Sequence, residues 1–281
     1  MLLSPRYDGP VILTIDGPID DQLAPIVRQR RRMETMLAAL DDEQWRAPSR
    51  CAGWSVQDVV AHLVGVNPFW ELSLSAGLAG TPTRVLGGFD PAASPPAMVG
   101  AMQQLTSTEV LERFVATNDG FLRVISSLDD HGWSTLAESP PGHVPIRLVA
   151  QHALWDCWIH ERDITVPLGI AGCAEPDEVR SCLRYAAAVS PALALGLGRP
   201  IVGTFAVAAS DPEVRFVVEV DTTVAVREGD AVEGAPCLRG RSVELVEALS
   251  IRGPLPVSAP AQWREALGGL AAAFDAVDGT W

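Results

Sequence analysis

The apolar residues in the first two thirds of the chain recur every three or four positions, which is the spacing of one face of an α-helix. This spacing predicts amphipathic helices at about 20–40, 55–78, 107–128 and 145–165. The second of them begins with Ser55-Val56-Gln57-Asp58, which has the form of a capping box. A fifth, alanine-rich helix is expected to follow Pro176 and to end before Pro191, because proline removes a backbone donor.

Beyond Pro200 the pattern changes to alternation and β-branched residues, which predicts a small antiparallel sheet. The expected strands lie at 201–209, 214–220 and 222–227, and two further helices are expected at 242–251 and 260–277. Near the start of the chain, a single β-like run from Val11 to Ile15 lies between two Gly-Pro pairs. We interpret it as part of an N-terminal extension.

These elements predict a helical part followed by an α+β part. We expect an N-terminal extension at 1–19, a four-helix bundle domain at 20–195 and a small α+β C-terminal domain at 196–281. Residues 79–100, which are rich in Gly, Pro and Ser, are predicted to form a long loop. Loops of this length in a compact domain are often functional, so we expect this one to cover a site.

The composition excludes several kinds of chemistry. All 21 basic residues are arginines, so the chain contains no lysine for a Schiff base, a pyridoxal phosphate anchor, a P-loop or a kinase-type phosphate clamp. The net charge of −14 argues against nucleic-acid binding, which rests on clustered basic charge. The abundance of Ala, Gly, Pro and Arg is typical of a GC-rich genome and suggests an actinobacterial source.

The termini and the cysteines add two further expectations. No basic flank followed by an apolar region begins the chain, and no stretch approaches the ~18 apolar residues of a membrane span. We therefore expect a cytoplasmic protein without a membrane partner. The five cysteines are irregularly spaced and form no CxxC motif, which argues against a disulfide framework or a cysteine-rich zinc site.

The five histidines are the most informative residues for chemistry. In the helix predicted at 145–165, His152, Asp156 and His160 are spaced four residues apart, so either neighbouring pair can converge on one point. The two outer histidines lie about 12 Å apart along the helix axis, so they cannot share one ion. One pair together with His62 from the second helix would form a three-ligand site that suits a divalent ion such as Zn²⁺.

The spacing by itself leaves the choice between His152 and His160 open. It also leaves open a purely structural interpretation, because short D-x-x-x-H patterns are common by chance. Asp58, four residues before His62, forms the same pattern but is explained as the capping partner of Ser55. The tryptophans of the helical part are expected to pack in the core.

Two longer motifs resemble a known family. Residues 45–63, which read WRAPSRCAGWSVQDVVAHL, and residues 155–164, which read WDCWIHERDI, are similar to the actinobacterial mycothiol-dependent maleylpyruvate isomerase family within the DinB-like superfamily. The resemblance covers about residues 20–170. Residues 238–253 resemble more weakly a helix of the sterol-carrier-protein-like domain that accompanies this family.

The resemblance implies a DinB-like four-helix bundle that binds a divalent metal, followed by a sterol-carrier-protein-like α+β domain. It implies His62, Asp156 and His160 as the metal ligands, in preference to His152, with Zn²⁺ as the expected ion. It also implies mycothiol as a thiol cosubstrate that the metal activates. The family pattern has Glu where this chain has Asp156, which places the ion closer to the helix and puts maleylpyruvate isomerisation itself in doubt.

Asp163 and Arg252 each have two possible roles, whereas the cysteines have no expected role in the chemistry. Asp163 could hold the second ring nitrogen of His160 or cap nearby backbone groups. Arg252 could bind an anionic substrate or stabilise a helix C-terminus. None of the cysteines is expected to replace the thiol cosubstrate, and Cys157 points about 100° away from Asp156.

The leading hypothesis is a metal-dependent enzyme that uses a low-molecular-weight thiol for isomerisation or thiol transfer on a small electrophile, acting as a monomer or homodimer. The catalytic residues beyond the ligands are not predicted. One alternative is a small-molecule binding or regulatory protein with a relic metal site. Another is a metal-dependent hydrolase that places water at the open position.

Overall fold

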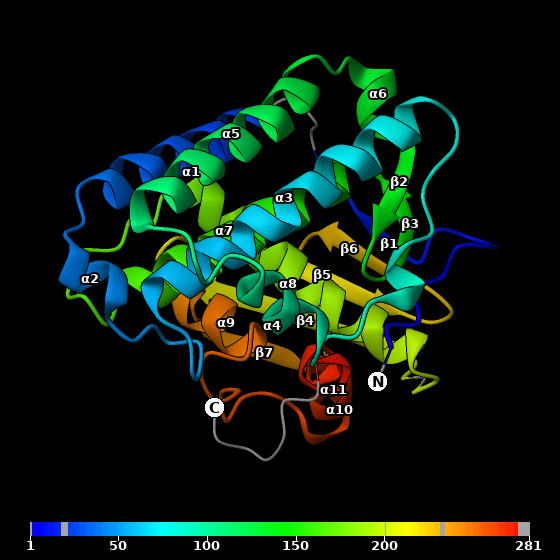
Figure 1. The fold of residues 1–281 in the computed structure, drawn as a ribbon. Coiled ribbons are helices and arrows are strands. Elements are labelled where there is room, and N and C mark those ends of the chain that lie inside the picture. Colours follow the sequence, from blue (N-terminus) through cyan, green and yellow to red (C-terminus); the bar gives the residue numbers. More distant parts are fainter. Residues whose placement is uncertain (1, 18–21, 200, 231–233, 275–281) are drawn as a thin grey trace.

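The predicted helices of the first part pack together in the computed structural model, which describes residues 2–17, 22–199, 201–230 and 234–274 (Figure 1). They are α1 (Leu23–Ala38), α3 (Val56–Leu78), α5 (Ser107–Ser126) and α7 (Ile146–Thr165). The helix α3 packs against α5 and α7, and α1 contacts the same two helices. The predicted positions of these helices are confirmed to within a few residues at each end.

Side-chain caps explain why these helices begin where they do. The Ser55 hydroxyl accepts the backbone N–H of Asp58, and the Asp58 carboxylate accepts the N–H of Ser55, so the capping box at α3 is confirmed. The same reciprocal pattern joins Thr106 and Glu109 at the start of α5. Another begins the short helix α2 (Asp42–Arg46).

The segment 79–100 is more ordered than predicted. It contains a 3₁₀ turn, η1 (Leu86–Gly88), and the helix α4 (Ser94–Gly100), whose first turn carries prolines that suit a helix start. Between α5 and α7 lie the short helix α6 (Asp130–Ser134) and an antiparallel hairpin, β2 (Leu136–Ser139) with β3 (Gly142–Pro145). The hairpin was not predicted, because strands of four residues carry too few positions to show alternation.

The fifth helix is longer than predicted. The helix α8 spans Pro176–Gly196 and passes through Pro191, so the expected end before this proline is wrong. Most residues of α8 are buried between α7 on one side and α9 and the sheet on the other. Packing on both sides stabilises the helix enough to outweigh the backbone hydrogen bond that Pro191 removes.

The sheet has the strand order β1-β6-β5-β4-β7. Its central members are β4 (Gly203–Ser210), β5 (Val214–Val220) and β6 (Val224–Glu228), which pair antiparallel as predicted. The edge strand β7 (Cys237–Arg241) was not predicted and pairs parallel with β4. The other edge, β1 (Leu13–Ile15), pairs parallel with β6, so this part of the expected N-terminal extension is built into the C-terminal sheet.

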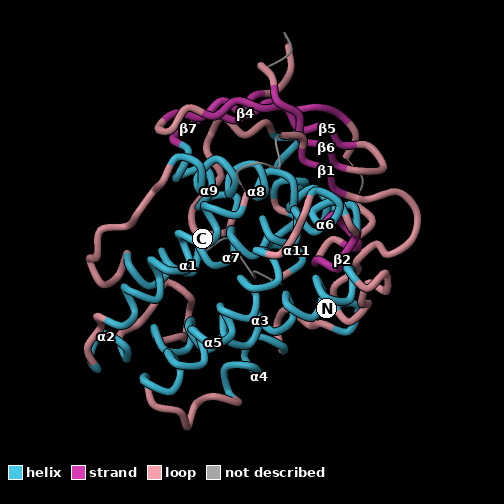
Figure 2. The backbone as a smooth tube through the Cα atoms, turned by 90° about the horizontal axis from the view of Figure 1, so that it is seen from above, coloured by secondary structure: helices cyan, strands magenta, loops and turns pink. Residues whose placement is uncertain are grey.

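The remaining helices cover one face of this sheet. Figure 2 shows the sheet as an outer layer, with α8 and α9 (Ser242–Leu249) lying beneath it. The single helix expected at 260–277 is divided into η2 (Ala261–Trp263), α10 (Arg264–Leu267) and α11 (Gly269–Ala273). Gly268 separates α10 from α11, and the last residues of the expected helix lie outside the described part. Within the described ranges, no helix is long and apolar enough to cross a membrane.

One hydrophobic core extends through both parts of the chain. It joins Phe121 of α5, Trp158 of α7 and Tyr185 of α8 to Phe216 of β5 and Trp263. A second, smaller cluster fills the space between α1, α3, α7 and the first turns of α5. The result is a mixed α and β protein in which α8 packs against both the helices of the first part and the sheet.

Candidate metal centre

Three predicted residues meet where α3 and α7 face each other. His62 lies in the second turn of α3, and Asp156 and His160 lie one turn apart on α7, with candidate ligand atoms that are all within 4.8 Å of one another. His160 Nε2 is 3.6 Å from Asp156 Oδ1, and the rings of His62 and His160 are 5.0 Å apart. Two imidazoles and a carboxylate at this spacing can hold one divalent ion.

His152 does not belong to this group. Its Nδ1 forms a 2.6 Å hydrogen bond with the Tyr185 hydroxyl, and its ring is surrounded by Trp70, Trp155 and Tyr185. Burial lowers the pKa of His152 to about 4, so the ring is neutral. Of the two pairs that the spacing allowed, the structure therefore groups His62 with Asp156 and His160.

The protonation states of His62 and Asp156 suit ligation. Burial, together with the charge of His160, lowers the pKa of His62 to about 4, which leaves a neutral ring with a free lone pair. Its Nδ1 is buried and has no hydrogen-bond partner among the described residues. Burial raises the pKa of Asp156, but the neighbouring histidines outweigh this effect and keep the carboxyl ionised.

Asp163 holds the second ring nitrogen of His160. Its Oδ2 lies 3.0 Å from His160 Nδ1, so of the two interpretations of Asp163 the hydrogen bond to the imidazole is the one observed. The carboxylate is fully buried, and it also accepts from Arg252 at 2.8 and 2.9 Å and from Arg50 at 3.2 Å. Burial opposes ionisation, but these partners keep the pKa of Asp163 well below its usual range.

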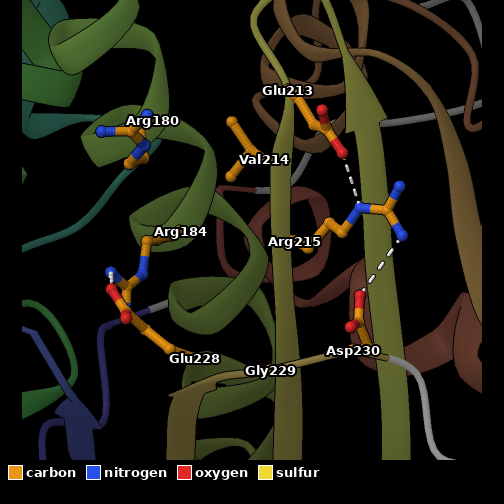
Figure 3. Close-up of a pocket in the computed structure, with 8 residues that line it drawn as sticks. All are labelled: Arg180, Arg184, Glu213, Val214, Arg215, Glu228, Gly229 and Asp230. Atoms are coloured by element: carbon orange, nitrogen blue, oxygen red, sulfur yellow. Dashed lines mark hydrogen bonds and ion pairs between the residues drawn. The ribbon is translucent and has the colours of Figure 1, made fainter.

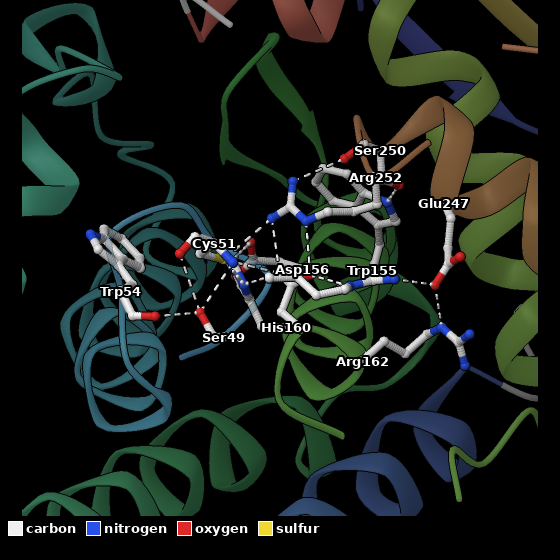
Figure 4. Close-up of polar contacts among 12 residues, drawn as sticks. Ser49, Cys51, Trp54, Trp155, Asp156, His160, Arg162, Glu247, Ser250 and Arg252 are labelled. Carbon is white, nitrogen blue, oxygen red and sulfur yellow. Dashed lines mark hydrogen bonds and ion pairs between the residues drawn. The ribbon is translucent and has the colours of Figure 1, made fainter. Parts of the chain in front are cut away.

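Arg252 belongs to this network and not merely to a helix end. It follows α9, and its guanidinium spans Asp163 and Cys51, with a 3.6 Å contact to the sulfur (Figure 4). Glu247 of α9 accepts from Arg50 and Arg162 beside it. The C-terminal part of the chain therefore supplies one wall of the site.

Cys51 lies beside the group, a position that the sequence analysis did not predict. Its thiol lies 3.1 Å from Asp163 Oδ2 and 3.8 Å from His160 Nδ1. Cys51, His160 and Asp163 thus form a second close group, but Arg252 already neutralises Asp163 and disfavours another cation there. The only signal in the sequence was the position of Cys51 within the first motif.

Cys157 is buried against Met33, and burial raises its pKa to about 11.

Two cavities of about 350 Å³ each meet at the three-residue group. They share five lining residues: His62, Pro95, His152, Asp156 and Phe274. Both cavities expose mainly apolar surface, and the one here called the polar cavity is named for its arginine; it is also lined by Cys51, Trp54, Ser250 and Arg252. The other, here called the apolar cavity, is also lined by Val66, Phe69, Trp70, Phe89 and Met98. Residues of the segment 79–100 line both cavities, so this segment covers the place where they meet.

Glu138 of β2 holds the covering segment in place. Its buried carboxylate accepts hydrogen bonds from the hydroxyls of Tyr7 and Thr83, at 2.5 and 2.6 Å, and from the backbone N–H groups of Val85 and Leu86, at 3.0 and 2.8 Å. Charge-assisted bonds of this kind are strong. The cover is therefore attached to the same hairpin that precedes α7.

A further hollow lies beside α8 and the sheet (Figure 3). It is lined by charged residues that pair with one another: Arg215 with Glu213 and Asp230, and Arg184 with Glu228. None of the predicted site residues lines it. Exposed pairs of this kind contribute little to binding or stability, so we assign it no function.

Comparison with known proteins places this geometry in a family. Residues 26–165, which include the three converging residues and Asp163, match the mycothiol maleylpyruvate isomerase N-terminal domain. The chain belongs to this family. The match confirms the resemblance seen in the two sequence motifs.

Solved structures extend the likeness beyond that domain. Two crystal structures of the mycothiol-dependent maleylpyruvate isomerase, one of them a histidine-to-alanine mutant, are similar to this chain. The mutant has a TM-score of 0.61 at 12% identity and the other structure 0.60 at 14%, each over 85% of this chain and 91% of the other. At these identities the likeness shows a shared fold. No curated protein matches the sequence.

In this member of the maleylpyruvate isomerase family, the protonation of His160 would govern how binding of a metal ion depends on pH. Burial lowers its pKa, but the hydrogen bonds to Asp163 and Cys51 outweigh burial and raise it to about 10, so the metal-free ring is cationic at neutral pH. A ligand must be neutral, so Zn²⁺ binding at pH 7 is expected to release about one proton per chain. Below pH 10 the apparent affinity is therefore expected to rise with pH. Calorimetry in two buffers of different ionisation enthalpy measures the proton, and its absence would contradict the prediction.

Proposed function

We propose that the protein is a metal-dependent enzyme that uses mycothiol as a nucleophile for isomerisation or thiol transfer on a small electrophilic substrate. The observation that carries the proposal is the convergence of His62, Asp156 and His160 at the junction of two cavities. Membership of a family whose name includes mycothiol supports the choice of thiol.

The residues fit a divalent metal. The unpartnered Nδ1 of His62 is costly to bury unless it finds a partner, and the donor set of two nitrogens and one carboxylate oxygen suits Zn²⁺. Asp163 would orient His160 from the outer shell. When bound, the metal supplies a positive charge that lowers the pKa of a thiol in its open position.

The protein's own groups prepare the site for this chemistry. The rings around His152 and the covering segment surround the ligands with apolar side chains, and a less polar environment strengthens electrostatic interactions there. Arg252, fixed by Asp163 at the mouth of the polar cavity, offers positive charge to an anionic group of the thiol or the substrate. We propose the polar cavity as the thiol side of the site.

The finer fold and cellular assignments are part of the same proposal. We propose a DinB-like four-helix bundle within 20–195 and a sterol-carrier-protein-like domain within 196–281, in a cytoplasmic protein of an actinobacterial host. Zn²⁺ is the proposed ion. The protein would work as a monomer or homodimer. Asp156 is one methylene shorter than the family Glu and would hold the ion closer to α7, and the proposal includes both isomerisation and thiol transfer.

The test is metal analysis followed by activity with and without metal. Protein purified without chelator is expected to hold about one divalent ion per chain. The metal-loaded form should catalyse consumption of mycothiol with an electrophile, and the chelator-treated form should not. Turnover without thiol would favour a hydrolase. Binding of apolar compounds that is indifferent to metal, with no turnover of any kind, would favour a binding protein and overturn the proposal.

A further inference from the structure

The apolar cavity differs sharply from the polar cavity in the charges that line it. Its walls are Val66, Phe69, Trp70, Phe89 and Met98, together with other apolar residues of the N-terminal and covering segments. Among the described lining residues the only carboxylate is that of Asp156, and there is no arginine. Arg252 lies in the polar cavity, on the other side of the three-residue group.

This asymmetry disfavours an anion in the apolar cavity. A carboxylate placed there would lose its hydration among hydrocarbon and aromatic walls that offer it no arginine. An apolar group would instead leave water for a surface of hydrocarbon and aromatic rings, which is favourable. The charge pattern therefore selects against a substrate with a carboxylate on this side.

The shape of the walls favours an aromatic or alkyl group. The rings of Phe69 and Trp70 pack edge to face at 4.8 Å, and Trp70 packs against His152 at 4.8 Å. A ligand ring can extend such an arrangement by offset or edge contact. Met98 adds a flexible side chain that adapts to different shapes. Val66 lies one turn after His62 on α3, so the apolar wall begins beside the proposed ligands.

We propose that the apolar cavity binds the hydrophobic group of an uncharged electrophile, and that its reactive carbon lies at the shared wall of His62, His152 and Asp156. The reaction in this inference rests on the proposed function, whereas the binding of the hydrophobic group does not. With an acrylamide as electrophile, the thiolate sulfur forms a bond to the terminal carbon. The π electron pair shifts toward the carbonyl, and the α-carbon then takes up one proton. This proton balances the one that the thiol released, so the addition consumes no proton overall.

The binding test uses unreactive propanamides, which need neither metal nor thiol. N-methyl-, N-butyl- and N-benzylpropanamide and the anionic N-propanoylglycine are titrated into the full-length protein by calorimetry. The affinity is expected to rise roughly fourfold for each methylene that becomes buried. The benzyl compound should bind well and the anion more weakly than the methyl compound. Equal binding of all four would overturn the inference.

Two variants locate the binding. Val66→Phe fills the apolar cavity and should lower the affinity for N-benzylpropanamide at least ~10-fold, which corresponds to about one buried aromatic contact or more. Ala92→Phe adds the same side chain at the wall of the polar cavity and should leave this affinity within about twofold, as expected for an exposed surface change. If Val66→Phe does not fold, Met98→Phe serves instead. An Ala92→Phe effect as large as that of Val66→Phe would overturn the assignment.

Turnover separates this inference from the proposed function. With metal and mycothiol present, N-benzylacrylamide is expected to react with a higher kcat/KM than N-methylacrylamide, and Val66→Phe should remove the difference. If the propanamides bind in the expected order but no thiol addition is catalysed, the proposed function fails and the cavity assignment stands. If thiol addition is catalysed equally for both acrylamides, the proposed function stands and the cavity assignment fails.

Discussion

His62→Ala is expected to abolish metal binding at micromolar ion concentrations and, with it, all thiol-dependent turnover. His62 is the only candidate ligand that α3 contributes to the group, and the two residues of α7 cannot by themselves complete the coordination. Loss of an outer-shell partner costs 10–100-fold in metal affinity, and loss of a ligand itself is expected to cost more. Metal analysis and a competition titration with a chromophoric chelator measure the effect.

His152→Gln is the matched control for this experiment. Like His62, His152 is buried and neutral and lines both cavities, but its partner is Tyr185. The variant should keep about one ion per chain, the content also expected for the wild type. If His152→Gln lost the ion and His62→Ala kept it, the other helical pair would be the ligand pair, and the proposed centre would be wrong.

Asp163→Asn is expected to lower the free energy of unfolding by about 3 kcal/mol, because it leaves buried cationic groups without their counter-charge. The fully buried carboxylate faces Arg252, Arg50 and His160 together. The Asp163→Asn substitution should also weaken metal binding 10–100-fold, since His160 would lose its orienting partner. Denaturant unfolding of the metal-free protein measures the first effect, and the chelator competition measures the second.

The exposed carboxylate of Asp119 provides the comparison. It pairs with Arg31 at 2.7 Å, with both side chains about half exposed at 45% and 48%. Asp119→Asn should change the stability by less than about 1 kcal/mol and leave metal binding unaltered. A similar loss of stability in both variants would mean that burial of the Asp163 network contributes little.

The helical part of the fold could be predicted from the sequence because its determinants are local. Apolar spacing and the capping box at Ser55 involve residues within a few positions of one another. The candidate metal residues were predictable for the same reason, since Asp156 and His160 are one turn apart on one helix. The choice of His160 over His152 required the family resemblance, because the two spacings are identical.

What could not be predicted depends on contacts between distant residues. The pairing of β1 with β6 joins segments more than 200 positions apart through three residues of strand. The interactions of Cys51 with Asp163 and of Tyr185 with His152 likewise have no local signal. The passage of α8 through Pro191 reflects packing on both faces, which overrides the local preference.

The parallel pairing of β1 with β6 has a consequence for protein engineering. A chimera that exchanges the C-terminal part after residue 195 for that of a relative would keep β1 while replacing the strand it pairs with. The edge of the new sheet would then face a foreign β1, and the buried side chains of Leu13 and Ile15 would meet a surface shaped by another sequence. A chimera that exchanges the C-terminal part between relatives therefore needs residues 11–16 to be exchanged together with the sheet.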